Sequence, residues 1–133
     1  MISAVADTNV YISALNFGGI PDEVLALARM GHIRICISRP ILDEIAGVLE
    51  RKFFWSEFQV SSAIHAIEEF TIPVYPTRTI YQITEDEPDN RILECAVEAK
   101  ADFIISGDKD ILRLNSYEQI RILRPREFLE EVK

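Results

Sequence analysis

Short apolar segments alternate with segments of helical periodicity along the whole chain. The apolar segments read as strands, and several of the segments between them repeat apolar residues every three or four positions, as amphipathic helices do. Strands separated by helices favour a parallel sheet that is covered by helices on both faces. The expected strands are residues 2–6, 33–38, 71–75, 103–105 and 120–123. The sequence therefore predicts an α/β fold around a mostly parallel sheet.

Helices are expected between these strands because the usual start and stop signals stand there. They are expected over residues 8–17, 21–31, 40 onward, 56–70, 89–100, a short segment after 108, and 125 onward. Residues 76–88 are expected to form a loop with one helical turn near Ile80, and Asp89 is expected to cap the helix that follows it. The unbroken apolar run 103–105 is typical of a central strand in a parallel sheet.

Two aspartates directly follow predicted strands. Asp7 comes after residues 2–6, and Asp108 comes shortly after residues 103–105. In open α/β sheets, ligands bind beyond the carboxyl ends of the strands. We therefore expect both carboxylates at the ligand-binding edge of the sheet.

Helix periodicity selects one further acid in each of two helices. Glu44 flanks the apolar stripe of the helix that begins near residue 40. Asp89 projects over the apolar side of its own helix, whereas Glu94 and Glu98 are expected on the far side. Asp7, Glu44, Asp89 and Asp108 thus form the candidate site.

Four carboxylates beside a core are costly unless positive charge meets them. The sequence offers two histidines and no convincing basic partner for this cluster. Mg²⁺ and Mn²⁺ take oxygen ligands and keep waters for substrate phosphates. The pattern therefore points to metal-dependent phosphate chemistry, with Asp86 and Asp110 as reserve acids, of which Asp110 could reach the same metal.

Each acid also has a purely structural interpretation. Asp7, Asp89 and Asp108 could simply cap helices or turns, which is worth about 1 kcal/mol for each cap. Glu44 could be a hydrogen-bonded glutamate at the rim of the core. The functional interpretation depends on all four acids occurring together.

Composition and size suit one globular domain over residues 1–133. Hydrophobic residues make up 48% and charged residues 27% of the chain, both ordinary values. No apolar run approaches the roughly 20 residues that span a bilayer, and no basic segment typical of a signal peptide opens the chain. Cys36 and Cys95 lack metal-ligand spacing and are expected as buried thiols in a reducing cytoplasm, although a disulfide between them stays open.

The net charge of −8 argues against nucleic acid, which usually meets a basic surface. Much of this charge would be local if the acids share one site, and a bound metal would offset it. A basic partner protein would also suit such a surface. The aromatic residues around 53–58 have two interpretations as well, either core packing between helices or an exposed contact for a partner; they are Phe53, Phe54, Trp55 and Phe58.

Three segments resemble the PIN-domain family, and specifically its VapC-like toxins. They are the opening Asp7-Thr8-Asn9-Val10, the segment Asp86-x-x-Asp89-Asn90-Arg91-Ile92-Leu93-Glu94, and the segment Phe103-Ile104-Ile105-Ser106-Gly107-Asp108-Lys109-Asp110. The resemblance extends from about residue 3 to about residue 129. One departure is Pro88, which stands directly before Asp89, whereas relatives more often have proline right after the first acid of that motif.

The resemblance implies a three-layer α/β/α fold and a Mg²⁺- or Mn²⁺-dependent ribonuclease, the toxin of a toxin-antitoxin pair. Its RNA substrate, a cognate antitoxin and a second copy of the chain in a homodimer would be the partners. Asp7, Glu44, Asp89 and Asp108 would be the catalytic and metal-binding acids. The implied supporting residues are Thr8, Asn9 and Ser106, and the candidate RNA contacts in the groove of a dimer are Arg39, Arg51 and Lys52.

Two alternative classes of function stay open. Another Mg²⁺-dependent phosphate hydrolase or a phosphoacceptor domain could use a similar sheet. A haloacid-dehalogenase-like enzyme would need a second aspartate two residues after the first, where this chain has Asn9. The other class is a PIN-like module that binds RNA or protein without cutting.

Overall fold

The computed structural model describes residues 1–83 and 87–132, so Asp86 lies outside the described residues. Within these ranges six strands form one sheet in the order β3-β2-β1-β4-β6-β5. The strands are β1 (Ser3–Ala6), β2 (Arg34–Ile37), β3 (Thr71–Pro73), β4 (Phe103–Ile105), β5 (Ser116–Tyr117) and β6 (Ile120–Leu123).

The first five neighbouring strands of this order run parallel, and only β5 runs antiparallel to its neighbour β6. The strand that sequence analysis did not predict is β5, because it is two residues long and only half-buried. The mostly parallel sheet is as predicted, and β4 is central and wholly buried. The carboxyl ends of β1, β2, β4 and β6 therefore lie along one edge.

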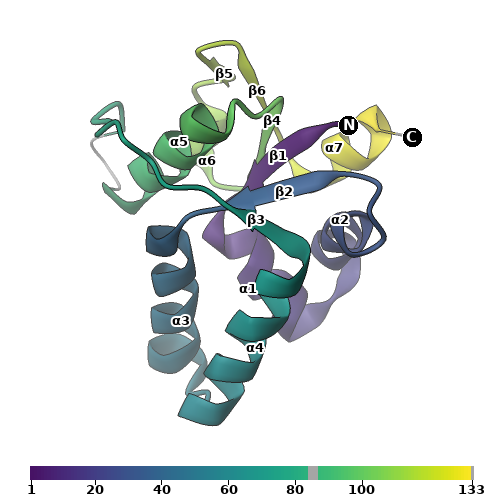
Figure 1. Ribbon diagram of the computed structural model, residues 1–133, viewed down its shortest axis with the longest axis vertical. Helices are drawn as coiled ribbons and strands as arrows, with labels where there is room; N and C mark the ends of the chain where they lie inside the picture. Colours follow the sequence, from purple (N-terminus) through teal and green to yellow (C-terminus); the bar gives the residue numbers. More distant parts are fainter. Residues whose placement is uncertain (84–86, 133) are drawn as a thin grey trace.

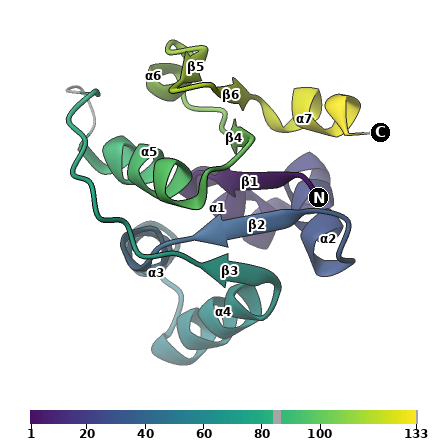
Figure 2. The same cartoon turned by 45° about the horizontal axis from the view of Figure 1, so that its top comes forward.

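Helices flank this sheet in the predicted α/β/α arrangement. They are α1 (Thr8–Phe17), α2 (Gly19–Arg29), α3 (Arg39–Phe53), α4 (Glu57–Phe70), α5 (Glu87–Ala99), α6 (Lys109–Leu112) and α7 (Pro125–Glu131). In Figure 1, α5 lies in front of the sheet and α1 lies behind it, while α3 and α4 extend downward as a pair. In Figure 2 the strands lie side by side between these helices.

The core lies between the sheet and the helices. Ala4, Val5 and Ala6 of β1 are completely buried, so the strand that leads into Asp7 has no solvent-exposed face. Cys36 and Cys95 are both buried and free, as thiols rather than a disulfide. Among the described residues, no helix is both long enough and apolar enough to cross a membrane.

Two local predictions were wrong. The residues around Ile80 form no helical turn. Asp89 does not cap α5, because the helix already begins at Glu87 and Asp89 lies within its first turn. The acidic residues of this turn still favour the helix, since anions near a helix N-terminus interact well with its dipole.

Glu94 was predicted on the side of its helix opposite Asp89, and it is nevertheless buried. The segment after β3 runs along α5 and covers that side (Figure 1). Three polar side chains, each one helical turn apart, hold this segment through its backbone amides. Asn90 accepts from Ile83 at 2.8 Å, Glu94 accepts from Ile80 at 2.9 Å, and Glu98 accepts from Thr77 at 2.9 Å.

Candidate metal centre

The register of the sheet brings Asp7 and Ser106 side by side. Ala6 pairs with Ile105 on the neighbouring parallel strand, and the Asp7 N–H donates to the Ile105 carbonyl at 3.0 Å. Asp7 and Ser106 are therefore the first residues beyond the carboxyl ends of β1 and β4. They lie at the edge where sheets of this type bind ligands, as predicted for Asp7.

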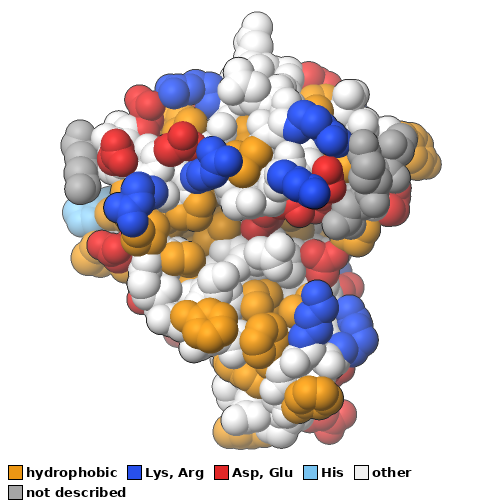
Figure 3. Space-filling model, turned by 180° about the vertical axis from the view of Figure 1, so that it is seen from behind, with side chains coloured by type: hydrophobic (Ala, Val, Ile, Leu, Met, Phe, Trp, Pro, Cys, Tyr) orange, Lys and Arg blue, Asp and Glu red, His pale blue; other side chains and the backbone are white. Residues whose placement is uncertain are grey.

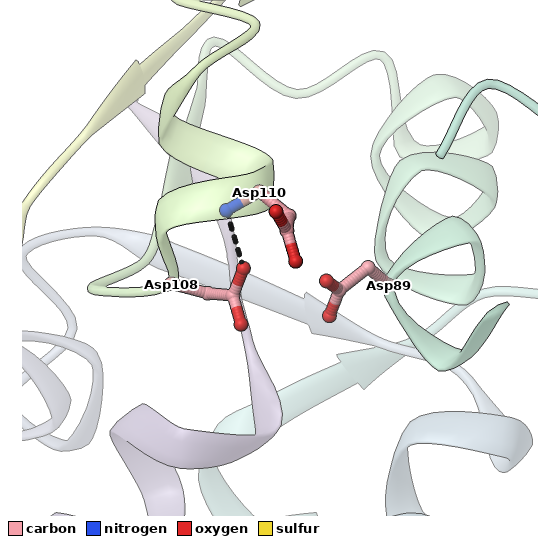
Figure 4. Close-up of side chains that lie close together, drawn as sticks. All are labelled: Asp89, Asp108 and Asp110. Carbon is pink, nitrogen blue, oxygen red and sulfur yellow. Dashed lines mark hydrogen bonds between the residues drawn. The ribbon is translucent and has the colours of Figure 1, made fainter. Parts of the chain in front are cut away.

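Three aspartates converge beside this edge. Asp89, Asp108 and Asp110 each offer a carboxylate oxygen, and these oxygens all lie within 4.8 Å of one another. Figure 4 shows the three side chains directed toward one another, Asp89 from α5 and the other two from the start of α6. All three are half-buried. This group could hold a divalent cation, and it includes the reserve acid Asp110.

Backbone donors fix Asp108 in place. Asp108 caps α6, and its Oδ1 accepts from the backbone N–H of Asp110 at 2.8 Å and of Ile111 at 3.3 Å. The other end of this turn is held by Ser106, whose hydroxyl oxygen accepts from the Asp108 N–H at 2.9 Å. The capping interpretation of Asp108 is therefore confirmed, and both cap hydrogen bonds use Oδ1.

Asp7 is the most deeply buried acid of the candidate site, with 3% of its surface exposed. Its Oδ1 accepts from the Val10 N–H at 3.1 Å, which caps α1, and its Oδ2 accepts from the Ser106 hydroxyl. Burial raises the pKa of Asp7 to about 6, although the hydrogen bonds from Ser106 and Val10 lower it, and the charge of Asp108 adds to the increase. Ser106 thus connects Asp7 to the turn that carries Asp108.

The remaining predicted site residues lie further from this group. Glu44 is half-buried on α3, and neither Glu44 nor Asp7 is part of the close group of three carboxylates. Thr8 is buried and Asn9 is exposed. Within the described residues, Thr8 Oγ1 has no hydrogen-bond partner.

The predicted RNA contacts are all exposed residues of α3. The Arg39 guanidinium lies 3.8 Å from Asp43 and 3.6 Å from Glu68, in two exposed ion pairs. Arg51 folds back over Gly47, where an added Cβ would meet its Nη1 at 2.6 Å. Lys52 lies in the last turn of the helix.

This region also includes three residues that were not predicted as parts of the site, namely Asn90, Arg91 and Arg113. Asn90 is completely buried and also donates to the Ile83 carbonyl at 2.6 Å, so it holds the loop before α5 against the helix that carries Asp89. The Arg113 guanidinium lies 3.5 Å from Asp110. The one signal in the sequence was the spacing of Asn90 and Glu94 by one helical turn, which places both on one side of α5.

The donor set fits a hard divalent cation. It consists only of carboxylate oxygens, which Mg²⁺ and Mn²⁺ prefer, and it comes from two elements that meet at the ligand-binding edge. A buried aspartate with a raised pKa lies next to it. Among the described residues, this is the one cluster of acids, histidines or cysteines close enough to share a metal ion.

Comparison with known proteins gives three kinds of match. A family model described as a PIN domain matches residues 3–110. A relative from Methanocaldococcus jannaschii, named "Uncharacterized protein MJ1680", is 36% identical over 143 aligned residues, which cover 98% of this chain and 91% of the relative.

Solved structures match at the level of the fold. The structure of VapBC-1 from nontypeable Haemophilus influenzae matches with a TM-score of 0.65 and 17% identity over 94% of this chain and 99% of that one. The crystal structure of VapBC2 from Rickettsia felis, bound to a DNA fragment from their promoter, matches with a TM-score of 0.63 and 17% identity, covering 91% of this chain and 97% of that chain.

Proposed function

This chain belongs to the PIN-domain family, and from this premise we propose that it is a metal-dependent endoribonuclease whose residues 1–133 act as one nuclease domain. The observation that carries the proposal is the convergence of Asp89, Asp108 and Asp110 beside buried Asp7, at the carboxyl edge of the sheet. Such a site suits the hydrolysis of a phosphodiester bond in RNA.

In this proposal Asp89, Asp108 and Asp110 hold Mg²⁺ or Mn²⁺, and Asp7 completes the negative charge around the ion. When bound, the ion supplies polarisation of the phosphate and a lower pKa for a water molecule. Ser106 orients Asp7 through its hydroxyl, and its oxygen holds the turn of Asp108. Glu44 is assigned the orientation of the attacking water from α3, and Thr8 and Asn9 support Asp7 from the start of α1.

The metal-free site brings several carboxylates together, and the Arg113 guanidinium, 3.5 Å from Asp110, offsets part of their mutual repulsion. Two carboxylates about 4 Å apart repel by roughly 4 kcal/mol at an effective dielectric constant of 20. The raised pKa of Asp7 fits this environment, since burial and the charge of Asp108 both favour its protonated form. A divalent cation removes the repulsion, so its binding and the ionisation of the acids support each other.

The test is cleavage of single-stranded and structured RNA by purified protein, with Mg²⁺ or Mn²⁺ and with EDTA. Cleavage is expected only with metal, and Asp108→Asn and Asp7→Asn are each expected to reduce its rate more than about 100-fold, as loss of a key electrostatic group does. Asp43→Asn is the matched control. Asp43 is an exposed acid of α3, so this substitution removes the same charge outside the site. Undiminished cleavage by Asp108→Asn would refute the assignment.

The same assay separates the alternatives. A PIN-like module that only binds would retain RNA without producing fragments under any metal condition. Another Mg²⁺-dependent phosphate hydrolase would release phosphate from monoesters and leave RNA intact.

We also propose that the chain is the toxin of a toxin-antitoxin pair and that an antitoxin protein binds it. The support is the likeness of its fold to two VapBC structures. Expression of the wild-type protein alone should stop growth of the host, whereas the Asp108→Asn variant should not. Growth that is equally unaffected by both proteins would count against the toxin role.

A homodimer is proposed through the aromatic end of the α3–α4 pair. Phe54 and Phe58 are 85% and 80% exposed, although neighbouring Trp55 packs partly against the core. Two large exposed aromatic rings favour association with a partner surface. Light scattering should give the mass of a dimer at tens of micromolar, and Phe54→Ser with Phe58→Ser should give that of a monomer. A wild-type monomer would refute the dimer.

A further inference from the structure

A groove lined by basic side chains lies beside the acidic group. Lys109, Arg113 and Arg124 border a hollow of about 370 Å³, together with one amide, Asn115, and one acid, Glu127. The rest of its lining is apolar and comes from α6 and β6. In Figure 3, which views the molecule from behind, several Lys and Arg side chains lie on the upper half, interspersed with Asp and Glu side chains.

The register of the sheet places Arg124 near the candidate metal centre. Leu123 pairs with Ile105, and the Ser106 N–H donates to the Leu123 carbonyl at 3.0 Å. Arg124 and Ser106 are thus the first residues beyond two adjacent parallel strands. Asp7, Ser106 and Arg124 follow one another along a single edge of the sheet, so one residue of the groove, Arg124, lies on the edge that carries Asp7.

The helix α6 connects the groove to the acidic group. Lys109 is its first residue and directly follows Asp108, and Arg113 directly follows its last residue. The Arg113 guanidinium, 57% exposed, lies 3.5 Å from Asp110. Arg113 therefore borders both the groove and the acidic group.

We propose that this groove holds the phosphodiester backbone of the RNA next to the bond that is cut; the proposal rests on the ribonuclease function proposed above. Single-stranded RNA is bound by positively charged grooves that follow its backbone. Arginine suits phosphate because its guanidinium can donate two parallel hydrogen bonds to it. The whole chain has a net charge of −8, which repels a polyanion such as RNA. The three cations around the groove would therefore direct RNA to the groove, next to the acidic group.

This assignment differs from the prediction of Arg39, Arg51 and Lys52 as RNA contacts. Those three residues all lie on α3, and none of them lines this groove. Lys109, Arg113 and Arg124 are separated in the sequence by short segments that fold α6 onto β6. Their common groove could therefore not be seen in the sequence.

The experiment measures binding apart from cleavage. A fluorescein-labelled single-stranded RNA of mixed sequence is titrated with protein in EDTA, and anisotropy is read at several salt concentrations. Lys109→Gln and Arg124→Gln are each expected to raise Kd about fivefold and to reduce the slope of log K against log salt by about 0.7, the value for one lost phosphate contact on a single strand. The double variant should show both effects combined.

The matched control is Arg126→Gln. Arg126 is exposed on α7, two residues from Arg124, and does not line the groove. Its substitution therefore removes the same charge outside the groove. Its Kd should stay within about twofold of wild type and its slope should not change. Polyglutamate of equal charge should compete poorly with the RNA, because carboxylates on a peptide do not follow the groove as ribose phosphates do.

Three outcomes would overturn the proposal: an unchanged Kd and slope in the double variant, an equal effect of Arg126→Gln, or equal competition by polyglutamate, which would indicate an acidic protein segment instead. The two proposals fail separately. If wild type cleaves RNA and the groove variants bind normally, the groove is wrong and the ribonuclease stands. If the variants lose binding but wild type never cleaves, the groove stands and the ribonuclease is wrong.

Discussion

Two buried carboxylates in this molecule have opposite surroundings. Glu94, 8% exposed, lies 2.8 Å from the Arg91 guanidinium and accepts from the Ile80 N–H at 2.9 Å. Asp7, 3% exposed, accepts from backbone N–H groups, that of Val10 among them, and from the Ser106 hydroxyl. Within the described part of the chain, no lysine or arginine pairs with Asp7, and burial raises its pKa to about 6.

The difference separates an acid with a structural role, Glu94, from the acid to which we assign a functional role, Asp7. A buried carboxylate with its own arginine and backbone donors is complete, and its removal leaves a charge unpaired. A buried carboxylate that has only neutral donors, and lies near further acids, still lacks positive charge. Glu94 therefore holds the loop along α5, whereas under the proposed function Asp7 belongs to a site that a divalent cation would complete.

The largest expected effect on folding comes from the structural acid. Glu94→Ala leaves Arg91 without its closest partner and the Ile80 N–H without an acceptor. We expect a loss of about 3 kcal/mol in the free energy of unfolding, the lower end for a broken buried pair, because Arg91 is 29% exposed and also contacts Glu87 at 3.0 Å. Urea denaturation of wild type and of Glu94→Ala measures this loss of stability.

Glu98→Ala serves as the control for this change. Glu98 is exposed and holds Thr77 one turn further along α5, so its loss should cost less than about 1 kcal/mol. Equal losses in the two variants would mean that the ion pair with Arg91 adds nothing beyond the hydrogen bond.

A smaller effect of opposite sign is expected for the functional acid. An increase in pKa from 3.8 to about 6 corresponds to roughly 3 kcal/mol against the ionised form in the fold. Asparagine removes this penalty but disturbs the hydrogen bond with Ser106, which costs about 1 kcal/mol. In EDTA at pH 7.5, the free energy of unfolding of Asp7→Asn should therefore be about 2 kcal/mol higher than that of wild type, which makes the variant more stable.

The pH dependence gives an independent check of the same comparison. Because the pKa of Asp7 is higher in the folded state, the folded protein binds the proton more tightly, and its stability falls as the pH rises from about 4 to about 6. The free-energy difference between Asp7→Asn and wild type, both metal-free, should grow over this window and level off above it. A difference that stays constant with pH would show that Asp7 ionises as easily in the fold as in the unfolded chain.

The smallest stability effect is expected for Asp89→Asn in EDTA. The substitution relieves repulsion from Asp108 and Asp110, but it also removes an anion from the first turn of α5, worth about 0.3–1 kcal/mol. We expect a net change below about 1 kcal/mol. Mn²⁺ at 100 times its Kd adds roughly 2.7 kcal/mol to wild type, and the variant should gain clearly less in thermal melts. Equal gains in both proteins would count against Asp89 as a ligand.

The fold could be predicted from the sequence because its signals are local. Apolar strands such as 103–105 and helix boundaries such as Pro40 depend on nearby residues, and the placement of Asp7 after a strand followed from them. The burial of Glu94 could not be predicted in this way. It depends on the segment 77–83, which has no regular structure. This segment is held over the outer side of α5 by hydrogen bonds from its backbone amides to Asn90, Glu94 and Glu98.

The candidate site was predictable to a similar extent. Strand ends and helix faces selected Asp7, Asp89 and Asp108, and the spacing of two residues identified Asp110 as a reserve. The close grouping of Asp110 with Asp89 and Asp108 depends on how α6 meets α5, which no pattern in the sequence encodes. The same holds for the basic groove, whose three cations meet only because α6 packs on β6.

The most direct test of this account is the binding of Mn²⁺ to the metal-free protein at pH 7.5, measured by titration calorimetry. Wild type is expected to bind Mn²⁺ saturably, and Asp43→Asn is expected to bind it equally well. Asp108→Asn should bind about tenfold more weakly or worse, since even outer residues of metal sites contribute that much. The account would be contradicted if wild type showed no saturable binding, or if Asp108→Asn bound Mn²⁺ as tightly as wild type.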